Sequence, residues 1–104
     1  MFEVKNLNIK MYEGDFGEQL PINIVKGEIL KEDILKFIIQ DKRHNDIINK
    51  EVEVSNNSFV FSLTQEETNL LKEGTYLWGL KQYRKDYLQD TLAANNIFEV
   101  ARGQ

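Results

Sequence analysis

The stretch FVFSLTQEETNLLKEGTYLWGLKQY, residues 59–83, contains two runs of alternating large apolar residues separated by a helix-forming segment. Because side chains alternate with period two along a strand, each run predicts a half-buried strand. The positions expected to face inward are Phe59, Phe61, Leu63, Tyr76, Trp78 and Leu80. Trp78 is the only tryptophan of the chain, and its place in this row favours a core role over a ligand platform.

The segment between the two runs predicts a short helical turn near residues 64–72. Thr64 and Glu67 have the spacing of a capping box, in which each side chain accepts a hydrogen bond from the backbone amide of the other residue. Leu70 and Leu71 are expected to close the helix with their side chains on its apolar side. The helix should therefore begin at Thr64.

The residues after this helix predict a sharp corner. We expect Gly74 to adopt the left-handed conformation that ends helices. Tyr76, two residues later, is expected to bury its ring while its hydroxyl bonds to nearby backbone. This arrangement is the tyrosine corner of immunoglobulin-like sandwiches.

Other alternating runs lie on both sides of this stretch. They predict strands near residues 7–12, 20–24, 35–41, 48–54, 88–92 and 97–100. Pro21 lacks a backbone donor, so its strand is expected at a sheet edge. The run at 35–41 also fits a helical stripe, but its β-branched and aromatic residues favour a strand. Asn95 and Asn96 are expected to introduce a bulge or bend.

Short strands at intervals of about 8 to 12 residues are typical of a sandwich or barrel. Polar clusters at 41–46 and 84–86 predict the turns between them. The 104 residues contain no repeat or linker and suit a single domain, 1–104. The predicted fold class is all-β, an immunoglobulin-like antiparallel β-sandwich of about seven strands with one short helical turn.

Composition narrows the classes of partner and site. The chain has no cysteine, which excludes disulfides and thiolate metal sites. Its net charge of −4 argues against a nucleic-acid backbone as the main partner. The N-terminal residues contain no continuous apolar run, so we expect neither a signal peptide nor a membrane anchor. The expected compartment of synthesis is a cytoplasm.

No group of residues has the spacing of a catalytic, cofactor or metal site. His44 is the only histidine, and the simplest interpretation is an exposed side chain in a charged loop. Asp41 and Asp46 do not match a calcium-binding loop. Glu66 and Glu67 are adjacent and would not face each other on a helix. We therefore expect a protein that is not an enzyme and holds no cofactor or metal.

Basic and aromatic residues alternate around the predicted hairpin at 83–87, as in surfaces that stack bases or sugars. The interpretation we favour is an exposed hairpin tip at which Tyr83 and Tyr87 pair across the turn. The candidate interaction surface consists of Leu77, Tyr83, Arg84 and Tyr87.

The order of the segments LTQEET, Gly74-Thr75-Tyr76, WGLKQYRKDYLQDTL and a final IFEV resembles the N-terminal immunoglobulin-like domain of phage baseplate upper proteins, from phages of Gram-positive bacteria. The acidic turn YEGDF at 12–16 fits the same pattern. The resemblance covers nearly the whole chain and rests on residues that determine a fold. It implies a β-sandwich that packs within a tail tip or fibre and does no chemistry. Such proteins usually continue into trimerising or receptor-binding segments, whereas this sequence stops at Gln104, so receptor binding is not implied.

The function expected from the resemblance is that of a non-enzymatic phage or prophage virion structural protein, assembled in the bacterial host cytoplasm. Its expected partners are other phage structural proteins or further copies of itself, with no nucleic acid and no membrane. Contacts are expected near the Pro21 strand or through Leu77, Tyr83 and Tyr87. The alternative is a carbohydrate-binding or adhesion module that uses the aromatic residues of the 83–87 hairpin, with a host cell-wall glycan as ligand.

Overall fold

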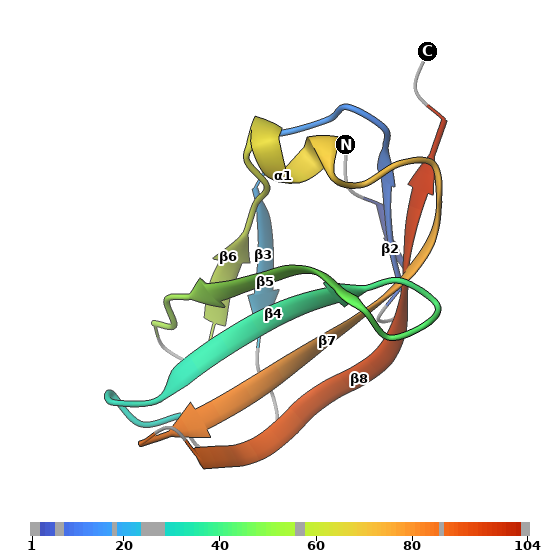
Figure 1. The fold of residues 1–104 in the computed structure, drawn as a ribbon. Coiled ribbons are helices and arrows are strands. Elements are labelled where there is room, and N and C mark those ends of the chain that lie inside the picture. The colour runs from blue at the N-terminus through green and yellow to red at the C-terminus, as the bar shows by residue number, and fades with distance from the viewer. Residues whose placement is uncertain are drawn as a thin grey trace.

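The computed structural model describes residues 3–5, 8–17, 19–23, 29–55, 58–85 and 87–102, and these residues are mostly β-strand with one short helix (Figure 1). The strands are β1 (Glu3–Lys5), β2 (Asn8–Tyr12), β3 (Leu20–Asn23), β4 (Ile34–Gln40), β5 (Asp46–Val52), β6 (Ser58–Phe61), β7 (Gly74–Arg84) and β8 (Tyr87–Ala101), and the helix is α1 (Gln65–Asn69). The predicted all-β class is confirmed. Leu7, Ile24 and Asp86, which belong to predicted strands and a predicted turn, lie outside the described residues.

The strands form two sheets. One has six strands in the order β1-β2-β8-β7-β4-β5, and the other pairs β3 with β6. Every pair is antiparallel except β2 and β8, which run parallel with Ile9 opposite Phe98. The prediction of an antiparallel fold is therefore wrong for this pair. The physical reason is that β2 and β8 lie far apart in the sequence, so no hairpin imposes an antiparallel arrangement on them.

The predicted strand positions are largely confirmed. Residues 34–40 form β4 rather than a helix. The strand that contains Pro21, β3, belongs to a sheet of two strands and is therefore an edge strand, as predicted. The last two predicted strands are wrong in one respect, because β8 is a single strand of 15 residues. The predicted irregularity is present within it: Asn95 has φ 56°, and the register of β7 and β8 shifts nearby. A bulge bends β8 there without ending it.

The core lies between the two sheets, and its residues follow the predicted alternation. The buried apolar residues that form one cluster are Ile9, Met11, Leu35, Phe37, Ile39, Ile48, Phe59, Phe61, Leu63, Leu71, Trp78, Leu80, Phe98 and Val100. Trp78 is only 5% exposed, and its ring stacks on Phe37 with centroids 5.0 Å apart. The inward orientation predicted for Trp78 is confirmed.

The helix begins as predicted. The Thr64 side-chain oxygen accepts a hydrogen bond from the Glu67 amide at 3.1 Å, and the Glu67 carboxylate accepts one from the Thr64 amide at 2.9 Å. Its end differs from the prediction. Leu71 is buried, but Leu70 is 57% exposed, because α1 ends at Asn69 and the two neighbouring leucines after it point in different directions.

Gly74 does not end the helix, which is a second correction. The C-cap is Leu70 in the right-handed conformation, and Gly74 instead begins β7. The predicted tyrosine hydrogen bond is present nonetheless. Tyr76 is half-buried, and its hydroxyl donates to the Lys72 carbonyl at 2.9 Å. This bond fixes the corner between α1 and β7.

Candidate functional site

The candidate site is the outer face, defined here as the side of β5, β4, β7 and β8 that points away from the β3–β6 sheet (Figure 1). Its orientation follows from burial along β4, where Leu35, Phe37 and Ile39 are buried in the core. The alternate residues must point outward. They face the outward residues of β7 in the pairs Ile34–Tyr83, Lys36–Lys81, Ile38–Gly79 and Gln40–Leu77.

Apolar side chains are exposed at several places on this face. Ile34 on β4 and both Leu88 and Ile97 on β8 are exposed, and Leu88 lies directly opposite Tyr83. Leu77 and Tyr83 are partly buried on the same face. The Lys36 ammonium lies over the Tyr83 ring, 4.9 Å from its centroid, as a cation–π contact.

A hollow of about 280 Å³ opens on the outer face beside Gly79. Its lining includes Ile38, Leu77, Gly79, Lys81, Thr91 and Ala94. Ile38 is only 6% exposed although it points outward. The hollow is thus apolar at Ile38 and basic at Lys81.

The hollow results from the bulge in β8. Trp78 pairs with Asn96 and Leu80 with Ala93, so two residues of β8 oppose Gly79 alone. A Cβ atom at position 79 would lie 2.8 Å from the Ala93 carbonyl oxygen. Only glycine fits this approach of two backbones. An isolated glycine within a strand pattern is a known sign of a bulge, and this was the signal in the sequence that could have located the hollow.

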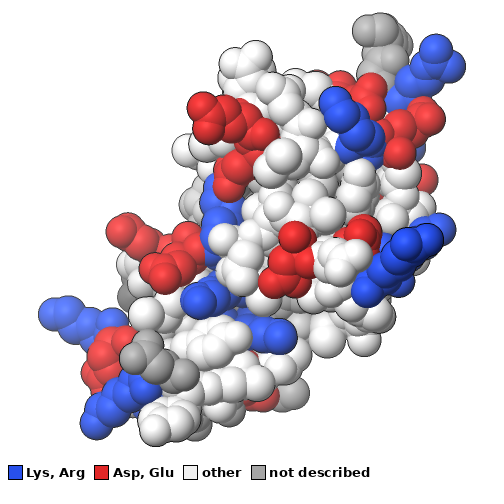
Figure 2. Space-filling view, viewed as in Figure 1, with Lys and Arg blue, Asp and Glu red and all other residues white. Residues whose placement is uncertain are grey.

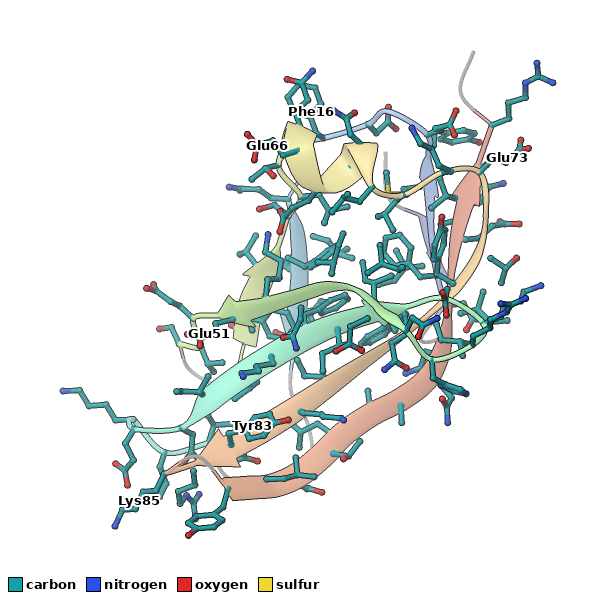
Figure 3. All side chains as sticks on the ribbon, viewed as in Figure 1. Phe16, Glu51, Glu66, Glu73, Tyr83 and Lys85 are labelled. Atoms are coloured by element: carbon teal, nitrogen blue, oxygen red, sulfur yellow. The ribbon has the colours of Figure 1, made fainter. Side chains whose placement is uncertain are left out.

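The four predicted interaction residues do not all share this face. Leu77 and Tyr83 lie on it, whereas Arg84 follows the inward alternation of β7 and pairs in register with Tyr87. Tyr87 is 79% exposed at the end of the β7–β8 hairpin. Figure 3 shows Tyr83 and Lys85 near this end of the molecule. Leu77 and Tyr83 therefore share the outer face but lie at opposite ends of its β4–β7 ladder, and Tyr83 is the one that lies close to Arg84 and Tyr87.

Arg84 is held by a buried carboxylate. Its Nε and one terminal nitrogen donate to the two oxygens of Asp33 at 2.8 and 3.0 Å. Gln82 and the Leu30 amide donate to the same carboxylate at 2.7 and 2.8 Å. The Asp33 side chain has no accessible surface, although the residue as a whole is half-buried. The hydrogen bond from Arg84 holds the pKa of Asp33 well below its ordinary value, and the other donors act in the same direction against the effect of burial.

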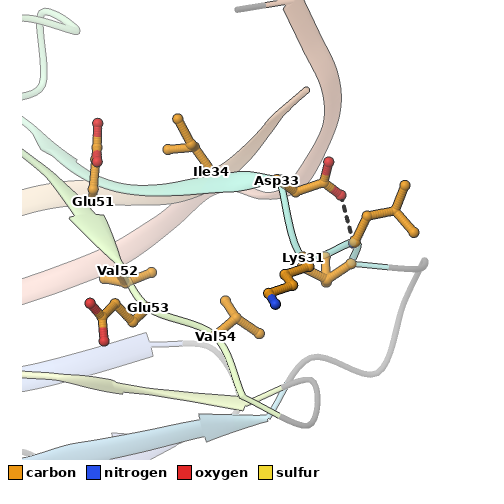
Figure 4. Close-up of a pocket in the computed structure, with 9 residues that line it drawn as sticks. Lys31, Asp33, Ile34, Glu51, Val52, Glu53 and Val54 are labelled. Carbon is orange, nitrogen blue, oxygen red and sulfur yellow. Dashed lines mark hydrogen bonds between the residues drawn. The ribbon is translucent and has the colours of Figure 1, made fainter. Parts of the chain in front are cut away.

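This cluster borders a groove of about 550 Å³ between residues 29–34 and 51–54 (Figure 4). Ile34, Val52 and Val54 supply apolar lining, and Lys31, Glu51 and Glu53 supply charges. The buried carboxylate at its edge already receives four hydrogen bonds. Its role is to fix the segment before β4 against the end of β7.

The charged loop at 41–46 has the structure of a hairpin turn. The Asp41 carboxylate accepts hydrogen bonds from the amides of Arg43 and Asn45 at 2.8 and 2.9 Å. The hydrogen bonds that Asn45 donates to this carboxylate, first from its backbone amide and then from its side chain, lower the pKa of Asp41. His44 is exposed, as predicted, and adopts φ 64°.

The Lys50–Glu67 ion pair links β5 to the start of α1 at 2.8 Å, and Lys50 also donates to the Ser62 carbonyl at 2.7 Å. Burial raises the pKa of Glu67, but the hydrogen bonds from Lys50 and Thr64 outweigh it and leave that pKa lowered. Glu67 therefore caps the helix, as predicted, and also joins α1 to β5.

Charges of both signs are mixed on the face shown in Figure 2, where acidic and basic side chains alternate with uncharged surface. Within the described ranges, no group of three or more His, Cys, Asp or Glu side chains is placed to hold a metal ion. No helix in that part of the chain is both long and apolar enough to cross a membrane. Comparison with protein-family models, with curated proteins and with solved structures finds no match.

Proposed function

We propose that this chain is a non-enzymatic structural protein of a phage or prophage particle, with an immunoglobulin-like sandwich fold that acts through protein–protein contacts. Its site of action is the virion, and its partners are other virion proteins or further copies of the chain. The observation that carries the contact function is the outer face, where Ile34, Leu88 and Ile97 expose apolar surface on one uncovered side of a sheet. Ile34 and Leu88 lie on either side of Tyr83, and exposed apolar patches of this kind mark interaction sites.

The order of the strands supports the immunoglobulin-like part of this proposal. In variable-type domains one sheet contains the strand order G-F-C-C′ and the other contains the neighbours B and E. Here β8-β7-β4-β5 lie opposite β3-β6, which matches that order. The Tyr76 hydroxyl bond to Lys72, at the corner that leads into β7, supports the same assignment.

The composition of the outer face supports protein rather than small-molecule partners. Apolar side chains surround a basic pair, Lys36 and Lys81, and the strands are rigid elements of a six-stranded sheet. An interface core of this type is apolar, with polar groups at its rim. The assignment of the partners to a phage particle rests on the sequence resemblance.

The test uses single cysteines, since the chain has none of its own. Leu88→Cys places a photo-crosslinker on the outer face, and Val60→Cys places one on β6, an exposed position of the other sheet. We expect crosslinks to other virion proteins in purified particles from position 88 and not from position 60. Absence of the chain from particles, or equal labelling from both positions, would contradict the proposal.

The second candidate function is carbohydrate binding, which the 79% exposure of Tyr87 favours. Tyr83 supports it less, because Lys36 already lies over its ring. Binding to purified cell-wall glycan should be lost in Tyr87→Ala if this surface is used. Binding that survives the double change Tyr83→Ala and Tyr87→Ala would exclude it.

A further inference from the structure

We infer that Phe16 of one copy inserts into the outer-face hollow of a second copy, so that copies of this chain join head to tail. This inference rests on the proposed function, because it specifies one of the protein contacts made by the same outer face. It commits to this chain as the partner.

The hollow suits one side chain of a partner. Small-molecule sites usually enclose about 300 to 1,000 Å³, and this hollow of about 280 Å³ falls below that range. Its lining combines Ile38 with the small residues Gly79 and Ala94, and it also includes the polar residues Gln40 and His44. An inserted ring would cover Ile38 and pack beside Gly79 and Ala94, which have little or no side chain.

The surroundings of the hollow are basic. Lys81 lines it, and Lys36 lies directly opposite Lys81 on the neighbouring strand. Like charges in directly opposed positions of a sheet repel each other. No ion pair joins either ammonium group to a carboxylate among the described residues. A partner that brings carboxylates would therefore relieve this repulsion.

Phe16 has the properties of an anchor. It is 55% exposed, in the loop between β2 and β3. The Thr68 hydroxyl donates to the Asp15 carbonyl at 2.8 Å, and the Gly17 amide donates to the Leu63 carbonyl at 3.0 Å. The backbone on both sides of Phe16 is thus tied to the α1 region. Such pre-organisation lowers the entropy lost on binding.

Carboxylates accompany this aromatic ring. Figure 3 shows Glu66, in the first turn of α1, close to Phe16. Asp15 directly precedes Phe16 in the chain, whereas the Glu13 carboxylate accepts a hydrogen bond from the Glu73 amide at 2.9 Å and so lies on the other side of α1 from Phe16 (Figure 3). An aromatic residue with acidic neighbours complements an apolar hollow with basic neighbours, and aromatic anchors in pockets carry much of the energy of interfaces.

The two surfaces belong to different parts of the molecule, so the contact is heterologous. In an open assembly, the copy at one end has an unused Phe16 and the copy at the other end has an unused hollow. Contacts of this kind extend into open chains unless the rotation closes them into a ring. In this contact the loop that carries Phe16 meets the outer face near Lys36 and Lys81. A symmetric contact would instead place identical surfaces of a chain with net charge −4 against each other.

Sedimentation velocity of the purified chain tests the inference over a series of concentrations. We expect the average sedimentation coefficient to rise with concentration and the rise to weaken at high salt. Phe16→Ser removes the anchor, and the double change Lys36→Glu and Lys81→Glu removes the basic pair. Each variant alone should weaken association by more than about tenfold, as expected for an interface hot spot. Val60→Ser, at an exposed apolar position on β6, is the matched control and should associate like the wild type.

Mixing the two variants distinguishes a head-to-tail contact from a symmetric one. The Phe16 variant keeps an intact hollow, and the lysine variant keeps an intact anchor. A mixture should therefore form one-to-one dimers and nothing larger. If the double lysine change unfolds the protein, as judged by circular dichroism, Ala94→Glu blocks the hollow from an exposed position instead.

A wild-type chain that stays monomeric at every concentration overturns the inference, as does a Phe16→Ser variant that associates normally. A mixture that forms no dimers does the same. None of these results would remove crosslinks from position 88 to other virion proteins. Failure of this self-contact and failure of the proposed function are therefore separate outcomes.

Discussion

The ring of Phe37 in the six-stranded sheet stacks on the ring of Phe61 in the two-stranded sheet, with centroids 4.1 Å apart and planes inclined by 25°. Trp78 also stacks on Phe37, with an interplanar angle of 4°. Phe37 thus connects the strand that carries the tryptophan to the opposite sheet. Aromatic pairs in such geometries contribute about 0.5 to 1.5 kcal/mol beyond the area they bury.

Replacement of Trp78 by alanine should lower the free energy of unfolding by about 3 to 5 kcal/mol, because it leaves a cavity beside Phe37. Urea denaturation followed by circular dichroism measures this loss without relying on the tryptophan signal. Val60→Ala, at an exposed position on β6, should cost less than about 0.5 kcal/mol. A loss below about 1 kcal/mol for Trp78→Ala would contradict the core role.

Replacement of Arg84 by methionine should destabilise the protein by about 1 to 3 kcal/mol, because the buried Asp33 carboxylate loses two of its donors. Arg43→Met, in the exposed loop at 41–46, is the matched control and should have little effect. Denaturation at neutral pH provides the measurement. Equal stability of the two variants would show that the Arg84 contact is dispensable.

The stability of the fold should fall in acid partly through Asp33. Its pKa in the folded state lies well below the ordinary value of 3.8, chiefly because of the Arg84 hydrogen bond. The ionised carboxylate therefore stabilises the fold above the unfolded pKa, and this contribution is lost as pH falls below it. Thermal unfolding measured from about pH 5 to pH 2 should show a shallower decline for Asp33→Asn than for the wild type. An identical slope would argue against this linkage.

Replacement of Gly79 by alanine should cost about 1 to 3 kcal/mol, because the new methyl group would press against the Ala93 carbonyl. Lys81→Ala, two residues along the same outward row, should leave stability nearly unchanged. Chemical denaturation compares the two variants. A stable Gly79→Ala protein would mean that β8 can move away from β7 at the bulge.

Loss of the capping hydroxyl in Thr64→Ala should cost about 0.5 to 2 kcal/mol, since the Glu67 amide then lacks its acceptor. Thr64→Ser keeps the hydroxyl and should retain most of the stability. Thermal unfolding of both variants provides the comparison. Similar losses in both would assign the effect to the threonine methyl group rather than to the cap.

The candidate site could be predicted only in part. Alternation along β7 places Leu77 and Tyr83 on the outer face, and this can be worked out from the sequence. The partner of Arg84 could not, because Asp33 is 51 residues away in the chain. The hollow depends on how β8 bulges past Gly79, which involves two strands at once.

The sequence by itself determined which residues face the core and where α1 begins, because period-two alternation and a capping box act over a few neighbouring residues. Only the tertiary structure decided that β2 lies parallel to β8, that Asp33 holds Arg84, and that β8 leaves a hollow beside Gly79. These features require segments distant in the chain to meet. Their geometry is set by the packing of two sheets on one core rather than by any local pattern.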